Sequence, residues 1–130
     1  MASRSLDALK PEFRALVNIW LEQCALQGLD ILVYCTYRSP EEQALEYAKG
    51  RTRPGPKTTN ARPGQSAHNW GLALDFVPMQ NGRPQWKNVA LYDAAIDLAI
   101  SAGLESLRDS KFPERAHIQM LAWRGYVPTN

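Results

Sequence analysis

Hydrophobic residues at the start of the chain recur at the spacing of an amphipathic helix. Apolar side chains stand three or four positions apart from residue 6 to residue 24, and Gly28 follows as a stop signal. The run ILVYCT at 31–36 is β-branched and aromatic, which predicts a largely buried strand. Ser39, Pro40 and Glu42 then form the start signal of a second helix that reaches Lys49.

The second half of the chain alternates in the same way between strand and helix patterns. Residues 50–65 are rich in Gly, Pro and basic residues and predict a long loop, and a strand follows at 71–77. The NGRP segment at 81–84 predicts a hairpin turn, and a helix runs from Asn88 to its stop at Gly103. An irregular segment at 104–115 precedes a last strand at 117–121. We therefore expect a single α+β domain over residues 1–130, in which helices flank an antiparallel sheet.

Composition and charge narrow the class of protein. The 130 residues are 45% hydrophobic and 22% charged, which is typical of one globular domain, and a net charge of +2 is too small to indicate nucleic-acid binding. The chain has no apolar run of about 18 residues, so we expect no membrane partner. Asp7, Glu12 and Arg14 interrupt any export segment, so we expect the chain to stay in the cytosol where it is made. We also expect it to be a monomer. Cys24 and Cys35 are then expected to be reduced and buried.

The segment SAHNWGLALD at 66–75 contains the first candidate site. His68 is one of only two histidines, and Asp75 follows seven residues later. On one flat strand these side chains would face opposite sides, so we expect His68 in a turn before the strand, with Gly71 allowing the bend. Zinc binds His, Cys, Asp and Glu, and a catalytic site uses three such ligands and leaves one position open. His117, on the last strand, is the candidate for the third ligand.

Each of these residues also has an ordinary structural interpretation. Either histidine could be a hydrogen-bonded core residue, Asp75 could cap a turn or pair with an arginine, and Glu114 could pair with a surface cation. An acidic group inside the apolar run LALDFV nevertheless needs a partner, because burial of an unpaired charge is costly. A metal ion would meet that need. Glu114 lies three residues before His117, close enough to transfer protons at such a site.

Three segments resemble a known family in the same order along the chain. SAHNWGLALD resembles the Ser-x-His-x-x-Gly-x-Ala-x-Asp motif of the zinc peptidases of the VanY and VanX type, which cut D-alanyl-D-alanine bonds. ERAHIQ at 114–119 is similar to the second family motif, an acidic residue followed three positions later by histidine. The third family feature is an arginine after the first strand, in a Tyr-Arg-Ser context with a glutamine shortly after. This sequence is similar to it at Tyr37, Arg38, Ser39 and Gln43. Phage relatives of the family include L-alanyl-D-glutamate endopeptidases, which act as endolysins.

The resemblance implies a fold and a set of site residues. The fold would be like that of the D-alanyl-D-alanine peptidases and the hedgehog domain. His68, Asp75 and His117 would hold zinc, and Glu114 would be the general base. Arg38 would neutralise the polarised carbonyl of the substrate or a nearby carboxylate.

The resemblance also implies a substrate and a biological setting. Ser66 and Gln43 would contact the substrate, which would be a stem peptide of bacterial peptidoglycan. We expect a phage endolysin that cuts the L-Ala–D-Glu bond, has no separate cell-wall-binding domain and waits in the host cytoplasm until a holin releases it. The long loop carries four basic residues, Arg51, Arg53, Lys57 and Arg62. They would either attract an anionic polymer of the cell wall or be ordinary solvated side chains.

Two other functions stay open at this point. One is a D-alanyl-D-alanine carboxypeptidase or dipeptidase, which would use the same metal site. The other is a zinc-binding module without catalysis, as the hedgehog domain illustrates. Glu114 discriminates an enzyme from a binding module, because a binding module has no need of a proton shuttle.

Overall fold

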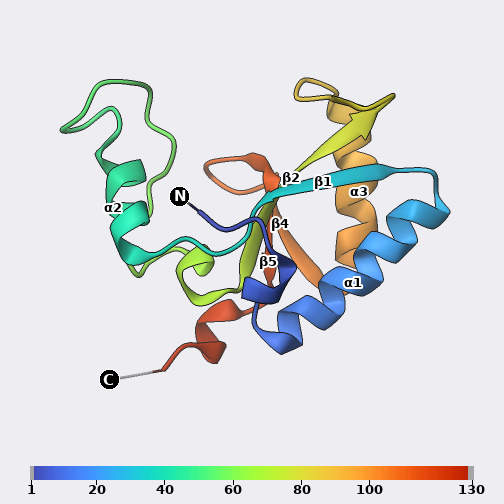
Figure 1. Ribbon diagram of the computed structural model, residues 1–130, viewed down its shortest axis with the longest axis horizontal. Helices are drawn as coiled ribbons and strands as arrows, with labels where there is room; N and C mark the ends of the chain where they lie inside the picture. The colour runs from blue at the N-terminus through green and yellow to red at the C-terminus, as the bar shows by residue number, and fades with distance from the viewer. Residues whose placement is uncertain (1, 129–130) are drawn as a thin grey trace.

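The computed structural model describes residues 2–128, and its centre is a five-stranded antiparallel sheet (Figure 1). Four strands lie in the order β1-β2-β5-β4, and β3 pairs with the far end of β2. The strands are β1 Asp30–Cys35, β2 Ala73–Gln80, β3 Arg83–Pro84, β4 Leu104–Leu107 and β5 Glu114–Met120. The two strands that carry the candidate ligands, β2 and β5, are therefore neighbours at the middle of the sheet.

Two long helices cover one face of this sheet. They are α1, Pro11–Leu26, and α3, Val89–Ser101, which pack against each other and against the strands (Figure 1). The shorter helix α2, Pro40–Ala48, lies on the other side of the molecule with the long loop that follows it. Three short 3₁₀ helices complete the fold: η1 Leu6–Ala8, η2 Ala67–Trp70 and η3 Trp123–Tyr126. Within residues 2–128, no helix is long and apolar enough to span a membrane.

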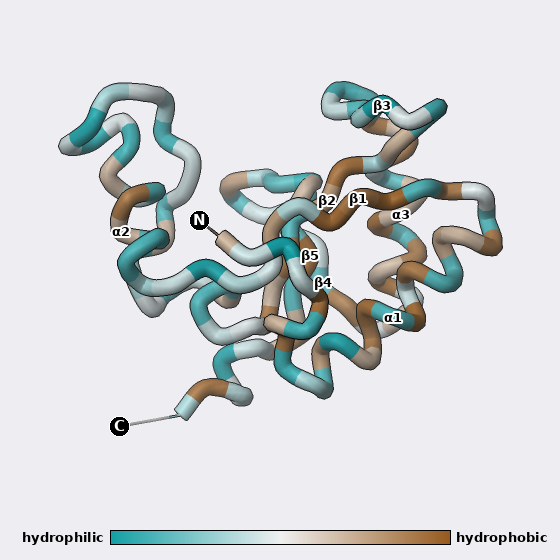
Figure 2. Tube along the Cα trace, in the orientation of Figure 1, coloured by the Kyte–Doolittle hydropathy of each residue, from teal (hydrophilic) through white to brown (hydrophobic). Residues whose placement is uncertain are grey.

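The hydrophobic core lies between the sheet and the helices α1 and α3. Trp20 is fully buried, packs edge-on against Phe76 with ring centroids 5.2 Å apart, and donates from Nε1 to the Ala95 carbonyl at 2.8 Å. Figure 2 shows the same layering as hydrophobic colour along β1 and on the facing parts of the helices. Since Leu74 and Phe76 fill the core, the residue between them, Asp75, projects from the opposite face of the sheet.

Most of the predicted elements are confirmed, and the end of the chain needs a correction. Residues 104–107, expected to be irregular, form β4, and the last strand begins at Glu114 rather than at His117. Neither LESL at 104–107 nor the added residues 114–115 show an alternation of apolar and polar side chains. They are extended because they pair with each other, and this tertiary contact cannot be predicted from the local sequence pattern. At the other end, Pro11 starts α1, and residues 6–8 form the separate helix η1.

Gly71 joins η2 to β2 in a conformation that only glycine adopts easily. Its φ is +69°, and a Cβ atom there would lie 2.9 Å from the Ala8 carbonyl oxygen. The Gly71 carbonyl in turn accepts from the Lys10 backbone N–H at 2.9 Å. The start of α1 is therefore packed directly against the turn that positions His68.

We expect Gly71→Ala to destabilise the protein more than the matched variant Gly28→Ala. Both glycines have φ near +70°, but nothing lies within 4 Å of a Cβ at Gly28. The left-handed conformation alone should cost about 1–2 kcal/mol, so Gly71→Ala should cost more because backbone atoms must also move. Urea unfolding of the two variants measures the difference. Equal losses would contradict the close packing at Gly71.

Candidate metal centre and active site

The carboxylate of Asp75 lies between the two histidines. Its Oδ1 atom is 3.2 Å from His68 Nε2 and 3.4 Å from His117 Nδ1. His117 is the direct partner of Asp75 across the β2–β5 pair, whereas His68 reaches the carboxylate from η2. The structure thus brings together the three residues that the sequence predicts as metal ligands.

The position of His68 follows from local sequence. Ser66 caps η2 by accepting from the His68 backbone N–H at 3.2 Å, and the side chain of Asn69 accepts from the Ser66 N–H in return. Gly71 ends the helix in the left-handed conformation. The prediction that His68 lies in a turn before the strand is confirmed. The Ser66 hydroxyl lines the adjacent hollow as well as capping the helix, and its predicted contact with the substrate stays a prediction.

Hydrogen bonds fix which nitrogen of each histidine faces Asp75. His68 Nδ1 lies 2.8 Å from the Thr36 carbonyl oxygen, so this nitrogen must donate and Nε2 is left for the site. His117 Nε2 lies 2.8 Å from Gln119 Oε1, and Gln119 donates its amide to Glu105. His117 therefore presents Nδ1 to the site. Metal-binding histidines commonly have such an outer partner, which sets the tautomer and the ring orientation.

The donor set fits a divalent cation. If both histidines were neutral, two nitrogen lone pairs would point at the same carboxylate oxygen, which is electrostatically unfavourable. A proton or a metal ion between these atoms removes the conflict. Two imidazole nitrogens and one carboxylate are the protein ligands of a zinc site that leaves a fourth position open.

His68 and Asp75 shift each other's pKa strongly. Burial alone would lower the pKa of His68, but the charge of Asp75 and its hydrogen bond raise the pKa of His68 to about 10. Burial alone would raise the pKa of the Asp75 carboxyl, yet the two histidines hold that pKa well below its usual range. Without a metal, the buried His68 and the partly buried Asp75 therefore form an ion pair.

Zinc loading should release a proton from this pair. At pH 8 the metal-free protein keeps the His68 proton, because the pKa of His68 is raised to about 10. Zinc must displace it, so binding should release about one proton and should weaken as the pH falls. Titration of zinc into the metal-free protein in weak buffer with an indicator dye measures the release. Asp75→Asn should release fewer protons at pH 8, because it removes the charge that raises the pKa of His68. Full loading of the unmodified protein with no proton release would contradict the ion pair.

Cys35 lies beside the site, although the sequence predicts it only to be a reduced, buried thiol. It is buried and free, as expected, and it pairs with Asp75 across β1 and β2. The possible ligand atoms of Cys35, His68 and Asp75 lie within 4.8 Å of one another, so these residues also form a group able to hold an ion. The thiol is 3.9 Å from His68 Nδ1, the nitrogen that Thr36 occupies. His117, whose Nδ1 faces Asp75, stays the predicted third ligand.

Arg38 lies beside Asp75, and Gln43 holds it there. The Arg38 Nη2 atom is 3.8 Å from Asp75 Oδ2, and Nη1 donates to Gln43 Oε1 at 2.9 Å. Gln43 is fully buried and donates to the Ala61 carbonyl at 2.7 Å. The Gln43 side chain thus supports the Arg38 guanidinium from the protein interior, and its expected contact with substrate stays a prediction.

Glu114 shares a hollow with the three candidate ligands. This active-site hollow has a volume of about 740 Å³ and is lined by Arg38 and Ser66 as well as by Glu114, His68, Asp75 and His117. In a regular strand, residues three apart face opposite sides, but the β4–β5 register shifts between Ser106 and Leu107. The irregularity allows Glu114 to reach the side of His117, as bulges beside active sites often do. Glu114 is exposed and makes no ion pair with another residue in 2–128.

An α+β domain with two histidines, an aspartate and a free glutamate in one hollow has the architecture of a metal-dependent hydrolase. The chain matches the VanY family, described as D-alanyl-D-alanine carboxypeptidase, over residues 7–110, and it belongs to that family. The matched region contains His68 and Asp75 and ends before Glu114 and His117. The expected membership of a peptidase family is therefore confirmed.

Individual relatives agree with the family and the fold. The chain is 33% identical over 113 residues to the peptidoglycan L-alanyl-D-glutamate endopeptidase CwlK of Bacillus subtilis, covering 75% of this chain and 64% of that protein. It thus spans less than two thirds of the length of this relative. The L-Ala D-Glu endopeptidase ChiX of Serratia marcescens superposes with a TM-score of 0.71 at 20% identity, over 97% of this chain and 92% of the other.

A third relative was solved with a metal ion. It is a mutant of the vancomycin-resistance D,D-pentapeptidase VanY in complex with Zn(II), with a TM-score of 0.67 at 16% identity, over 89% of this chain and 74% of the other. These likenesses confirm the predicted fold class, a small α+β domain of the D-alanyl-D-alanine peptidase type.

Proposed function

We propose that this protein is a zinc-dependent peptidase that hydrolyses a bond in the stem peptides of bacterial peptidoglycan. The observation that carries the proposal is the convergence of His68 Nε2 and His117 Nδ1 on one oxygen of Asp75. Arg38 and Glu114 stand in the same hollow, so a substrate carbonyl near the three ligands would meet both side chains.

The proposed reaction assigns a task to each side chain. His68, Asp75 and His117 would hold zinc, which supplies a Lewis acid when it is bound. Glu114 takes a proton from the attacking water and delivers it to the leaving nitrogen. The Arg38 guanidinium, fixed by Gln43, stabilises the negative charge that develops on the carbonyl oxygen.

For the bond that is cut, we propose L-Ala–D-Glu. Two relatives, CwlK and ChiX, are named for that activity, and CwlK has the higher sequence identity. We further propose the setting of a phage endolysin that acts as a monomer on the cell wall after a holin opens the host membrane. The description of the family favours a second candidate, a D-alanyl-D-alanine carboxypeptidase. A binding module without catalysis is disfavoured because Glu114 stands unpaired in the hollow, where only a reaction needs it.

Digestion of purified peptidoglycan tests the bond directly. We expect new amino termini on D-Glu and L-Ala left on the glycan, both identified by mass spectrometry of the soluble and insoluble fractions. Release of free D-Ala would instead support the carboxypeptidase. Absence of any new terminus from zinc-loaded protein would contradict the peptidase proposal.

Replacement of Glu114 by glutamine tests the proton shuttle. Glu114→Gln keeps the size and the hydrogen-bonding shape of the side chain but removes its basicity. Turnover should fall by about 10²–10⁴, the usual contribution of general acid–base catalysis, while zinc content and thermal stability should stay close to those of the unmodified protein. Near-normal turnover in the zinc-loaded variant would rule out this role, and loss of zinc would make Glu114 a ligand.

A further inference from the structure

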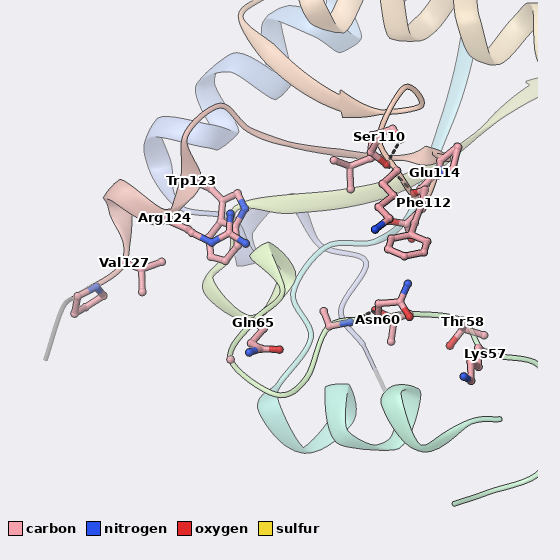
Figure 3. Close-up of a pocket in the computed structure, with 17 residues that line it drawn as sticks. Lys57, Thr58, Asn60, Gln65, Ser110, Phe112, Glu114, Trp123, Arg124 and Val127 are labelled. Atoms are coloured by element: carbon pink, nitrogen blue, oxygen red, sulfur yellow. Dashed lines mark hydrogen bonds between the residues drawn. The ribbon is translucent and has the colours of Figure 1, made fainter. Parts of the chain in front are cut away.

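A second depression, shown in Figure 3, shares Glu114 with the active-site hollow. It has a volume of about 950 Å³ and runs between the long loop, the β4–β5 connection and η3. In Figure 3, Trp123 and Arg124 stand across from Gln65, and Phe112 stands across from Asn60. Glu114 lines both depressions, so the active-site hollow is open at this end and a substrate can extend beyond it.

Three cations line this depression: Lys57, Lys111 and Arg124. None of them forms an ion pair with another residue in 2–128, whereas Arg108 elsewhere on the surface is paired with three aspartates. Glu114 is the single acidic side chain among the described lining residues. The depression, which we call the cationic groove, therefore carries positive charge that the protein itself does not balance.

Aromatic rings support two of these cations. The Arg124 guanidinium carbon lies 4.5 Å from the centroid of Trp123, which is buried. The Lys111 ammonium lies 5.8 Å from the centroid of Phe112, which is 60% exposed. A stacked guanidinium is held in place and keeps its N–H groups at the ring edge for a ligand. Apolar surface beside unpaired cations suits a peptide that carries a carboxylate.

We propose that the cationic groove binds the part of the substrate on the C-terminal side of the cut bond, through a carboxylate on that part. The inference rests on the proposed function. Glu114 returns its proton to the leaving nitrogen, so that nitrogen lies where the hollow and the groove meet, and the chain beyond it enters the groove. A glutamate linked to the next residue through one carboxyl group keeps the other as an anion. Arg38 lines the hollow but not the groove, so it acts at the carbonyl, whereas Arg124 lines both and stands where they meet.

Two soluble peptides that differ in one group test this assignment. Both contain L-Ala–D-Glu continued through the γ-carboxyl group, one with the free α-carboxylate of D-Glu and the other with a carboxamide there. The triple variant Lys57→Gln/Lys111→Gln/Arg124→Gln should lower kcat/KM on the carboxylate peptide by about tenfold and leave the carboxamide peptide within about twofold. The unmodified enzyme should therefore prefer the carboxylate, and the variant should not.

A matched control separates the groove from net charge. Arg4→Gln/Arg83→Gln/Lys87→Gln removes three exposed cations that do not line the groove. This control should keep the preference for the carboxylate. Equal losses of kcat/KM on the carboxylate peptide in the control and the groove variant would mean that general charge attraction causes the effect, which would overturn the proposal. A groove variant that still prefers the carboxylate peptide would overturn it as well.

Binding measurements distinguish this inference from the proposed function. Zinc-loaded Glu114→Gln, titrated with each peptide by calorimetry, should bind the carboxylate peptide more tightly, and the groove substitutions should abolish the difference. If this binding preference is found but the unmodified protein does not cleave L-Ala–D-Glu, the proposed bond is wrong and the assignment of the groove as a carboxylate site stands. Equal binding of the two peptides would overturn the groove and leave the proposed bond standing.

Discussion

The carboxylate of Asp75 is the constraint on which the site depends. It stands on the central strand β2 between the core residues Leu74 and Phe76 and is mostly shielded from water, so leaving its charge unpaired would be unfavourable. Two histidines from separate parts of the chain, η2 and β5, compensate it. The site forms only when the turn at Gly71 and the β2–β5 pairing are both in place, so the fold and the metal centre are coupled.

A second layer of contacts orients the residues that face the hollow. The Thr36 carbonyl fixes His68, the Gln119–Glu105 pair fixes His117, and Gln43 fixes Arg38. Each contact limits its partner to one orientation before any ligand binds, which is how rigid sites reduce the cost of ordering during a reaction. Glu114 has no such partner in 2–128 and is exposed, which suits a group that must move protons.

The sequence predicted much of this site because its central features are local. Gly71, the spacing of His68 and Asp75, and the caps at Ser39 and Asn88 each act within a few residues, and the structure confirms the elements that they indicate. Features that depend on pairing across the sheet were missed or misjudged, as with β4 and the start of β5.

Distant contacts of single residues were also beyond local pattern. Gln43 is a buried support for Arg38, and its amide donates to the Ala61 carbonyl, eighteen positions along the chain. Cys35 comes to face Asp75 only through the irregular β1–β2 register. The carbonyl of Thr36 is a backbone atom, so no residue type could have indicated it.

The arrangement of ligands around one ion is the central claim, and anomalous diffraction at the zinc edge tests it most directly. Crystals of zinc-loaded protein should give one strong peak about 2.0–2.2 Å from His68 Nε2, His117 Nδ1 and an oxygen of Asp75. A peak that bonds Cys35 in place of His117, or the absence of any peak beside Asp75, would contradict the account.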